Sequence, residues 1–256
     1  MDVLKKELQE AFARQTFDQR QLNEHDVETC RQHLDHITAV TQGCAVLSDL
    51  ATNSSYFSIG RLASILGIVA DVPKEELIDI DEDFIYQQMH PEDLVDKRML
   101  ELRFFEFLMG QPTAEQRHYY SCCRIRIKDR EGDYIYINNQ THMLSHSADG
   151  NMRLFTCLYE ISPDQEPIRG INPRIVNNAT GEVRQLSLYE DRYTILSKRE
   201  KEILQLISKG ALSKEIADRL HISIHTVNTH RQNILQKLSV DNSMEAVQTA
   251  MAMRLI

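Results

Sequence analysis

The sequence predicts an α+β fold of two domains, in which a region of helices and sheet precedes a C-terminal region built of helices alone. Three observations predict this architecture. The chain has 256 residues, more than one domain usually holds. Its middle contains three runs rich in β-branched and aromatic residues, which are typical of strands. Its segment 194–256 carries apolar residues at helical spacing, punctuated by residues that start and end helices.

Residues 1–43 are expected to form two N-terminal helices. The stretch lacks proline, and apolar side chains recur at helical spacing over 4–12 and again over 27–41. Gly43 is expected to end the second helix in the left-handed conformation. The second apolar series is too short for an independent coiled coil, so this helix is expected to pack on its own domain or on a second copy of the chain.

Residues 44–162 are expected to form an antiparallel sheet with helices to one side. Two stretches of turn-forming residues separate the strand-like runs, and a short helix and an acidic helical stretch precede them. The predicted helices lie at 62–68 and 79–107, and the predicted strands at 119–127, 134–137 and 152–159.

Residues 163–193 are interpreted as a linker. Pro163, Pro167, Gly170 and Pro173 interrupt regular structure in its first part, as is typical of a domain boundary. The stretch 174–184 around Asn-Ala-Thr-Gly is expected to form a small hairpin within this linker.

Composition excludes several classes of protein. Hydrophobic residues make up 42% and charged residues 26%, and no segment approaches the roughly 18 consecutive apolar residues of a membrane helix. The charged start of the sequence does not resemble a secretory signal, so we expect a cytoplasmic protein with no membrane contact. The five cysteines lack C-x-x-C spacing and are expected to be reduced thiols, and no cofactor is identified.

The net charge of −9 is divided unevenly along the chain. The segment 194–256 has nine lysines or arginines and six aspartates or glutamates, a charge of +3, which leaves −12 for the residues before it. Only the C-terminal segment therefore has the charge expected of a surface that faces phosphate.

The segment 194–256 is predicted to be an all-α domain. Ser197 and Glu200 form a capping-box pattern at the start of its first helix, and Gly210 is expected to end that helix. Two further helices, at 213–220 and 226–238, are joined by a short turn and have the spacing of a helix-turn-helix unit.

The second helix of this unit is expected to bury one side and expose the other. Ala217 is small enough to let the two helices approach closely where they cross. Asn228, Thr229 and Gln232 then lie on the exposed side, where polar side chains reach base edges in a major groove. Ser223 is expected to cap this helix, whose positive N-terminal end favours a nearby phosphate.

Residues 44–162 resemble a PAS domain. The resemblance rests on the order of four motifs: a strand-turn-strand before 62–67, His90-Pro-Glu-Asp93, a second strand-turn-strand at 123–136, and a last strand that ends at 160–162. It implies a domain that either encloses a small ligand or pairs two chains, and the sequence leaves both alternatives open. The pattern of a flavin photosensor and a placed haem-binding histidine are both absent, so the ligand is unknown.

The segment 194–256 resembles the LuxR-type DNA-binding domain of the NarL and FixJ relatives over its whole length. The stretches that carry the resemblance are 196–207, Gly210, 214–217, 222–223, 226–227, His230, 234–238 and 245–247. By this resemblance the side chains that read bases are Asn228, Thr229 and Gln232. Those at or near backbone contacts are Lys214, Ser223, Thr226, His230, Arg231 and Lys237. A last helix over 243–253 supplies the dimer contact, with Val247 and Met251 as its seam.

Three positions depart from the family pattern. Leu212 stands where the family usually has Ser or Thr, and Ser213 where it usually has Asn, so the cap of that helix is expected to shift by one residue. Gln232 is often Lys in relatives. One cation fewer then faces the groove, which lowers the expected affinity and salt dependence.

Together the resemblances predict a bacterial transcription regulator that binds double-stranded DNA as a homodimer and is controlled by its PAS-like domain. RNA polymerase and a small-molecule ligand of the PAS-like domain are further candidate partners. The alternative hypothesis is that the N-terminal region is a protein-interaction platform and that DNA binding is secondary. No constellation of nucleophile, base and orienting group is present, so the chain is not predicted to be an enzyme.

Two patterns that resemble chemical sites have simpler explanations. The carboxylates and histidines between His25 and His36 have helical spacing, but they lack a clear ligand set, so no metal site is predicted. His90 and Asp93 flank Pro91 and are interpreted as a helix start rather than as acid–base catalysts.

Overall fold

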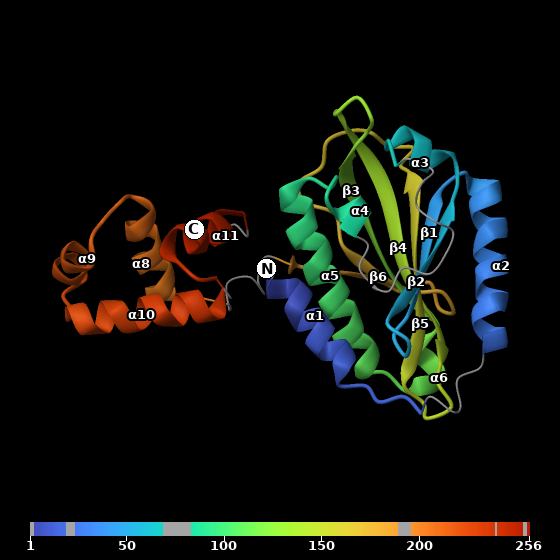
Figure 1. Cartoon of the computed structure of the whole chain (residues 1–256), viewed down its shortest axis with the longest axis horizontal. Coiled ribbons are helices and arrows are strands. Elements are labelled where there is room, and N and C mark those ends of the chain that lie inside the picture. Colours follow the sequence, from blue (N-terminus) through green and yellow to red (C-terminus); the bar gives the residue numbers. More distant parts are fainter. Residues whose placement is uncertain (1–2, 19–23, 69–82, 189–195, 239, 253–254) are drawn as a thin grey trace. The chain divides into compact units, whose positions relative to one another are not determined.

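The computed structural model describes residues 3–18, 24–68, 83–188, 196–238, 240–252 and 255–256. The chain divides into two compact units, Leu8–Leu186 and Ser187–Ile256, with Met1–Glu7 grouped with the second (Figure 1). We call the first the sheet domain and the second the helical domain. Among the described residues, no helix combines the length and apolar character that a membrane span needs.

The sheet domain contains one antiparallel sheet of seven strands in the order β2-β1-β5-β4-β3-β6-β7. The α+β class predicted from the sequence is therefore confirmed. The strands are β1 (Cys44–Asp49), β2 (Ser54–Ile59), β3 (Tyr119–Lys128), β4 (Tyr134–His146), β5 (Met152–Ile161), β6 (Arg174–Asn177) and β7 (Val183–Gln185).

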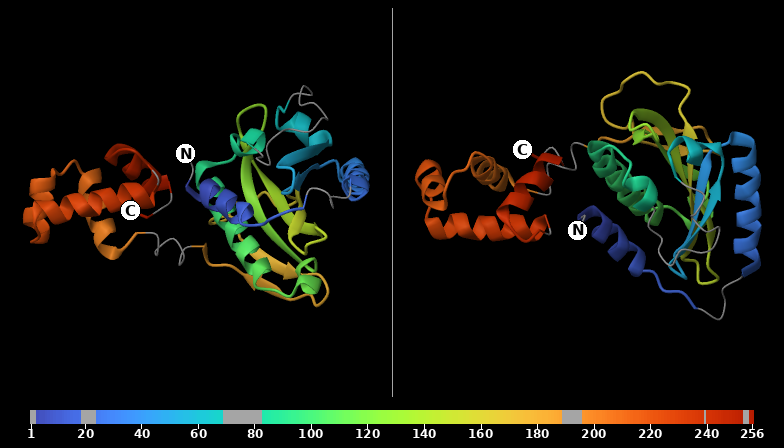
Figure 2. Two further views of the ribbon diagram at one scale, coloured as in Figure 1. Left: turned by 60° about the horizontal axis from the view of Figure 1, so that its bottom comes forward. Right: turned by 45° about the horizontal axis from the view of Figure 1, so that its top comes forward.

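Helices cover both faces of this sheet, whereas helices on one face only were expected. Neighbouring strand residues point to opposite faces. Met143 and Phe155 belong to the cluster beneath α5 (Pro91–Met109), whereas the adjacent Leu144 and Leu154 belong to the cluster beneath α2 (Glu24–Thr41). Figures 1 and 2 show α5 and α2 on opposite sides of the strands. The strands can take apolar side chains on both faces because each face has its own helix.

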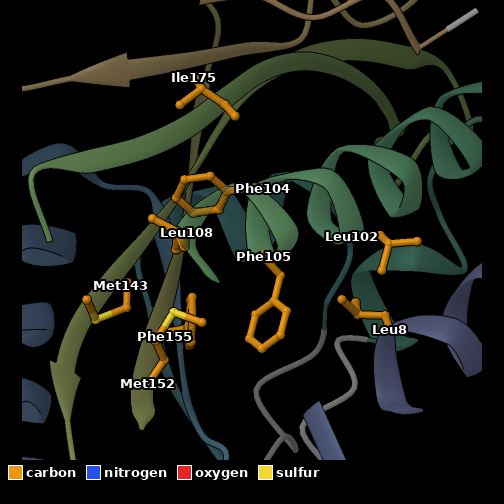
Figure 3. Close-up of a cluster of buried hydrophobic side chains, with 9 residues drawn as sticks. All are labelled: Leu8, Leu102, Phe104, Phe105, Leu108, Met143, Met152, Phe155 and Ile175. Carbon is orange, nitrogen blue, oxygen red and sulfur yellow. The ribbon is translucent and has the colours of Figure 1, made fainter. Parts of the chain in front are cut away.

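The main core lies under α5 and receives side chains from distant parts of the chain (Figure 3). Helix α1 (Val3–Ala13) contributes Leu8 and Phe12 to it. The Phe12 ring stands edge-on to Phe105 with 4.9 Å between ring centroids. The buried members of this core are Leu8, Leu102, Phe104, Phe105, Leu108, Met143, Met152, Phe155 and Ile175.

Three short helices connect the strands: α3 (Arg61–Ile65), α4 (Asp83–Tyr86) and α6 (Thr113–Gln116). The interpretation of His90 and Pro91 as a helix start is confirmed, because the Glu92 backbone N–H donates to His90 Nδ1 at 3.3 Å and Pro91 is the first residue of α5. Asp93 is buried and accepts two hydrogen bonds from the Arg126 guanidinium. Residues 79–82 of the predicted acidic helix lie outside the described residues.

Gly43 does not take the conformation that was expected of it. The left-handed residue is Gln42, with φ of 58°, and Gly43 has another role. A Cβ atom at position 43 would lie 2.4 Å from the Tyr159 carbonyl oxygen. Glycine is therefore required here by the close approach of β5 to the end of α2.

The sheet domain extends further along the chain than the predicted boundary at residue 162. The expected hairpin is present as β6 and β7, and β6 pairs with β3 as part of the sheet. Ile171 and Ile175 are buried, so this segment adds to the core and is not a free linker. The Asn177 carboxamide oxygen shapes the turn by accepting from the backbone N–H groups of Ala179 and Thr180.

The helical domain contains four described helices, which agrees with the predicted all-α region (Figure 2). They are α8 (Lys198–Ser208), α9 (Ser213–Leu220), α10 (Ile224–Lys237) and α11 (Ser243–Ala252). Their buried side chains are almost all apolar. Those from α8 to α11 with the least exposure are Ile203, Leu204, Ile216, Val227, Ile234, Ala246 and Ala250.

Candidate nucleic-acid interface

Helix α8 starts at the capping box that the sequence predicts. The Glu200 backbone N–H donates to Ser197 Oγ at 3.3 Å, and the Ser197 N–H donates to Glu200 Oε2 at 2.7 Å. Two of the four N–H groups that a helix start leaves unpaired are satisfied in this way. After Lys209, Gly210 adopts φ of 82° and ends the helix as expected.

Helix α9 starts without a side-chain cap. The Leu212 side chain has no acceptor, and the expected shift of the cap by one residue does not occur, because α9 begins at Ser213. The Leu212 N–H instead donates to Glu215 Oε2 at 2.8 Å. Helix α9 ends at His221, which has φ of 53°, and this left-handed residue turns the chain toward α10.

Helix α10 is capped by Ser223, as predicted. The Thr226 N–H donates to Ser223 Oγ at 3.0 Å, and the two hydroxyl oxygens lie 2.9 Å apart. Ala217 on α9 is buried, and so are Val227 and Ile234 on α10. Helices α9 and α10 are in contact, and Ala217, the small residue expected at their crossing, is buried.

The opposite side of α10 is exposed and polar. His225, Asn228, Thr229 and Gln232 are all exposed, and their spacing of three or four residues places them along one side of the helix. We call these four residues the exposed face of α10. The Thr229 hydroxyl donates to the His225 carbonyl oxygen at 3.1 Å, so it is left as an acceptor, whereas the amides of Asn228 and Gln232 offer both donors and acceptors.

Residues 194–250 match the model for bacterial regulatory proteins of the luxR family. The helical domain is a LuxR-family domain. That family consists of regulators and not of enzymes, in agreement with the prediction from the sequence.

Curated relatives match short stretches of the chain. The oxygen regulatory protein NreC of Staphylococcus carnosus is 47% identical over 66 residues, which are 26% of this chain and 30% of NreC. The uncharacterized response regulatory protein YgeK of Escherichia coli K12 is 52% identical over 58 residues, 23% of this chain and 40% of YgeK. The matched region spans less than half the length of these relatives.

Two solved structures also match, with low TM-scores. The response regulator ChrA of a heme-sensing two-component system is 38% identical over 30% of this chain and 34% of ChrA, with a TM-score of 0.24. The Vibrio cholerae VqmA dimer is 16% identical over 86% of this chain and 87% of VqmA, with a TM-score of 0.32.

The predicted backbone-contact residues of the LuxR-family domain differ in their surroundings. Lys214 is exposed in the first turn of α9 and has no partner among the described residues. Ser223 and Thr226 are engaged in the cap of α10. His230 is half-buried, and its Nδ1 atom is buried without a hydrogen-bond partner in the described part of the chain.

Two of these cations are engaged within the LuxR-family domain. The Lys237 ammonium lies 2.7 Å from Glu200 Oε2. Burial alone would raise the pKa of Glu200, but the hydrogen bonds from Lys237 and Ser197 hold this pKa below its ordinary value. The Arg231 guanidinium donates to Ser213 Oγ at 2.9 Å and to Ser243 Oγ at 2.8 Å. Sequence reasoning did not find these contacts, because they join residues of different helices.

The predicted dimer seam is only partly on the surface. Val247 is 8% exposed and packs within the LuxR-family domain, whereas Met251 is 54% exposed. Met244 is 69% exposed and lies two turns before Met251. It was not predicted as part of the dimer seam. The exposed side of α11 therefore has Met244 and Met251 as its apolar residues. His225 on α10 was also missed, although it lies three residues before Asn228 and helical spacing places it on the same side.

A second candidate site lies in the sheet domain, where α5 buries charged groups against β4. The Lys97 side chain is fully buried, and its ammonium lies 2.7 Å from Glu101 Oε1 and 3.5 Å from Thr141 Oγ1. The Tyr86 hydroxyl donates to the same carboxylate, and the Arg98 guanidinium stacks on the Tyr86 ring. Burial would raise the pKa of Glu101, but the charges of Lys97 and Arg98 lower it. We call these residues the buried ionic cluster.

The polar surroundings of this cluster continue along the inner face of the sheet. Asn139 Oδ1 lies 3.8 Å from Cys123 Sγ, and Thr141 Oγ1 lies 3.5 Å from Cys157 Sγ. Burial raises the pKa of Cys123 to about 12, so its sulfur is a thiol and not a reactive thiolate at neutral pH. The five cysteines are all free, in agreement with the predicted reduced thiols.

The carboxylate and histidine pattern of α2 has a structural explanation. Asp35 accepts hydrogen bonds from Tyr56 Oη at 2.9 Å and from Ser58 Oγ at 2.5 Å, which fastens α2 to β2. In the part of the chain that the structure describes, no three His, Cys, Asp or Glu side chains are grouped as metal ligands.

Proposed function

We propose that the chain is a transcription regulator that binds double-stranded DNA through α10. The observation that carries the proposal is the exposed face of α10 on a LuxR-family domain. A helix of this kind presents amide and hydroxyl groups to base edges in a major groove. The charge of +3 in the segment 194–256 supports the same role, since phosphate contacts supply much of the affinity for DNA.

Within this interface Asn228, Thr229 and Gln232 read bases. Amide side chains suit this role, because an amide can pair with adenine through two hydrogen bonds. Lys214 binds backbone phosphate, for which its exposed and unpartnered ammonium is available in the described structure. Ser223 and Thr226 act at the capped start of α10, where backbone N–H groups and the helix dipole favour a phosphate. His230 and Lys237 lie near the backbone contacts.

Selection from a library of random DNA duplexes with the full-length protein tests this function. Asn228→Ala and Gln232→Ala are each expected to relax the selected sequence at one position and to cost about 1–3 kcal/mol of discrimination. Gln205→Ala on α8 is the matched control, since Gln205 is equally exposed but lies outside the exposed face of α10. If no sequence is enriched, or if the control relaxes selection as strongly, the assignment of α10 is wrong.

We further propose that the protein acts as a homodimer and that the sheet domain is a PAS-like regulatory domain. The exposed Met244 and Met251 on α11 support pairing through that helix. The PAS-like reading is supported by the order of elements, in which β1 and β2, the short α3, α5 starting at His90 and the hairpin of β3 and β4 follow the four motifs. In this proposal a small ligand of the sheet domain would control the dimer.

The alternative is a protein-interaction platform. Native mass spectrometry of the full-length protein, purified from cells, separates the two. A bound small molecule on a dimer supports the regulatory proposal, and a stable complex with another protein supports the platform. Met251→Glu with Gln248→Glu as its control tests α11, since both positions are exposed on the same helix. Only Met251→Glu is expected to raise the dimer dissociation constant, by roughly tenfold or more.

A further inference from the structure

Arg231 is the side chain that joins three helices of the LuxR-family domain. It lies on α10, and its two terminal nitrogens donate to different hydroxyls: Nη1 to Ser213 at 2.9 Å and Nη2 to Ser243 at 2.8 Å. Ser213 is the first residue of α9, and Ser243 is the first residue of α11. One planar guanidinium therefore fixes the starts of two helices to the middle of a third.

Charge attraction does not explain this arrangement. Arg199 and Lys237 each lie within 2.8 Å of a carboxylate, but Arg231 has no carboxylate partner among the described residues. The start of a helix carries partial positive charge, so a cation gains nothing from lying beside two of them. The hydrogen bonds to the two hydroxyls are what hold the guanidinium in place, and they require the fork of an arginine.

Neither serine is needed to cap its own helix. Leu212 occupies the cap of α9, and the Asn242 carboxamide oxygen accepts from the backbone N–H groups of Met244 and Glu245 at the start of α11. The hydroxyls of Ser213 and Ser243 are thus left to Arg231. Both serines can be changed to alanine without loss of a cap, which isolates the contacts of the guanidinium.

We propose that Arg231 is a positioning residue that fixes the angle between α10 and α11, and that it is not primarily a phosphate contact. The proposal rests on the proposed function, in which α10 reads a half-site and α11 pairs the two chains. In a dimer the angle between these helices sets the separation of the two α10 helices. Arg231 thereby sets the spacing between half-sites that the protein accepts, which is about one helical turn of DNA for such dimers.

The two roles of Arg231 predict different results for one pair of variants. Ser213→Ala with Ser243→Ala keeps the guanidinium and removes its anchors, and Arg231→Lys keeps the charge but cannot bridge both hydroxyls. The test is selection by the full-length protein from duplexes in which the distance between half-sites varies. We expect both variants to accept several spacings in place of one, with roughly tenfold weaker binding to the best site. The slope of affinity against salt should be unchanged.

A phosphate contact predicts the reverse. The double serine variant would then bind like the unchanged protein, and Arg231→Met would lower the slope of log affinity against log salt by about 0.9 without altering the preferred spacing. That result would overturn the proposal. Ser208→Ala is the control for loss of a serine, since the Ser208 hydroxyl bonds only within its own helix, to the Gln205 carbonyl oxygen.

A measurement without DNA separates failure of this inference from failure of the proposed function. Amide hydrogen exchange in the full-length protein reports how firmly the first turn of α11 is held. We expect the amides of residues 244–247 to exchange roughly tenfold faster in both variants than in Ser208→Ala. Unchanged exchange there would overturn the positioning role even if DNA binding is sequence-selective. Faster exchange without any DNA binding would support the positioning role of Arg231 and contradict the proposed function as a DNA-binding regulator.

Discussion

The two domains differ in what they bury. The sheet domain buries ion pairs: Lys97 with Glu101 on α5, and Arg153 with Asp49 on neighbouring strands. The LuxR-family domain buries an almost purely apolar core, and Glu200 is its one buried charged residue among those described. Buried ion pairs add little net stability but are costly to break, whereas apolar cores lose stability in proportion to the volume removed. The two domains should therefore respond differently to mutation and to pH.

The largest effect is expected from breaking the Asp49 and Arg153 pair. The two side chains are nearly fully buried and make a bidentate contact, with Arg153 Nη2 2.7 Å from Asp49 Oδ2. Asp49→Ala leaves the guanidinium charge buried, so we expect the sheet domain to lose about 3–5 kcal/mol of unfolding free energy. Urea unfolding of the full chain measures this as a shift of one of two transitions.

The double variant Asp49→Leu with Arg153→Met sharpens that result. It removes both charges and keeps similar volume, so it should recover most of the lost stability. A double variant as unstable as Asp49→Ala would mean that the ion pair itself stabilises the fold. The two domains would then not differ in how buried side chains contribute to stability.

The next effect tests the apolar core of the LuxR-family domain. Leu204 is fully buried on α8. Leu204→Ala should cost about 3 kcal/mol, from lost burial and from the cavity that remains. The shift should be confined to the transition of the LuxR-family domain, as followed by exchange of the amides of α10. A loss of unfolding free energy below about 1 kcal/mol would show that the core rearranges to fill the cavity, which a close-packed core does only in part.

A smaller effect, which depends on pH, comes from His142 on β4. Burial lowers its pKa to about 4, whereas an unfolded histidine has a pKa of 6.5. Between these values the unfolded chain takes up a proton that the folded domain does not. The contribution of His142 to stability is therefore complete above pH 6.5 and is lost as pH falls toward 4, with a loss of about 2 kcal/mol at pH 5.

The matched variants for this pH response are His142→Asn and His225→Asn. Unfolding at pH 7 and pH 5 should show a smaller decline in the sheet domain for His142→Asn only, because His225 is exposed on α10. An equal decline in all three proteins would assign the pH response to other groups.

The smallest effect concerns the cap of α8. Ser197→Ala removes the hydroxyl that accepts from the Glu200 N–H, and should destabilise the LuxR-family domain by about 1 kcal/mol. Ser208→Ala, near the other end of the same helix, is the control. Equal stability of Ser197→Ala and the control would show that the Lys237 and Glu200 contact alone holds this helix start.

The difference between the domains also governs how much the sequence predicts. In the LuxR-family domain the start and end signals are local: Ser197 with Glu200, Gly210 and Ser223 each act within a few residues, and the structure has them where expected. The exposed side of α10 follows from helical spacing in the same way. What escaped prediction there, the Arg231 contacts and the burial of Val247, depends on other helices.

The sheet domain was less predictable because its polar residues are placed by tertiary contacts. β4 was expected to end at residue 137, but it continues to His146 through Asn138, Asn139, Gln140, Thr141 and His142. These residues have low strand propensity or polar side chains, and they are tolerated because the buried ionic cluster and neighbouring strands satisfy them. The segment 163–185 was interpreted as linker because Pro163, Pro167 and Pro173 interrupt it, and it contributes few apolar side chains, Ile171 and Ile175, to the core.

The pairing of strands from both ends of the sheet domain has a consequence for synthesis of the chain. β1 is made early, but its partner β5 ends at Ile161, and the Gln15 carboxamide bonds to the backbone of Met152, 137 residues later. During synthesis the first helices and strands therefore cannot complete their packing until the chain has been translated nearly to Leu186. Their apolar sides stay exposed until then. The LuxR-family domain needs only its own short stretch of sequence. Cotranslational folding should thus be slow and dependent on chaperones for the first domain, and rapid for the second.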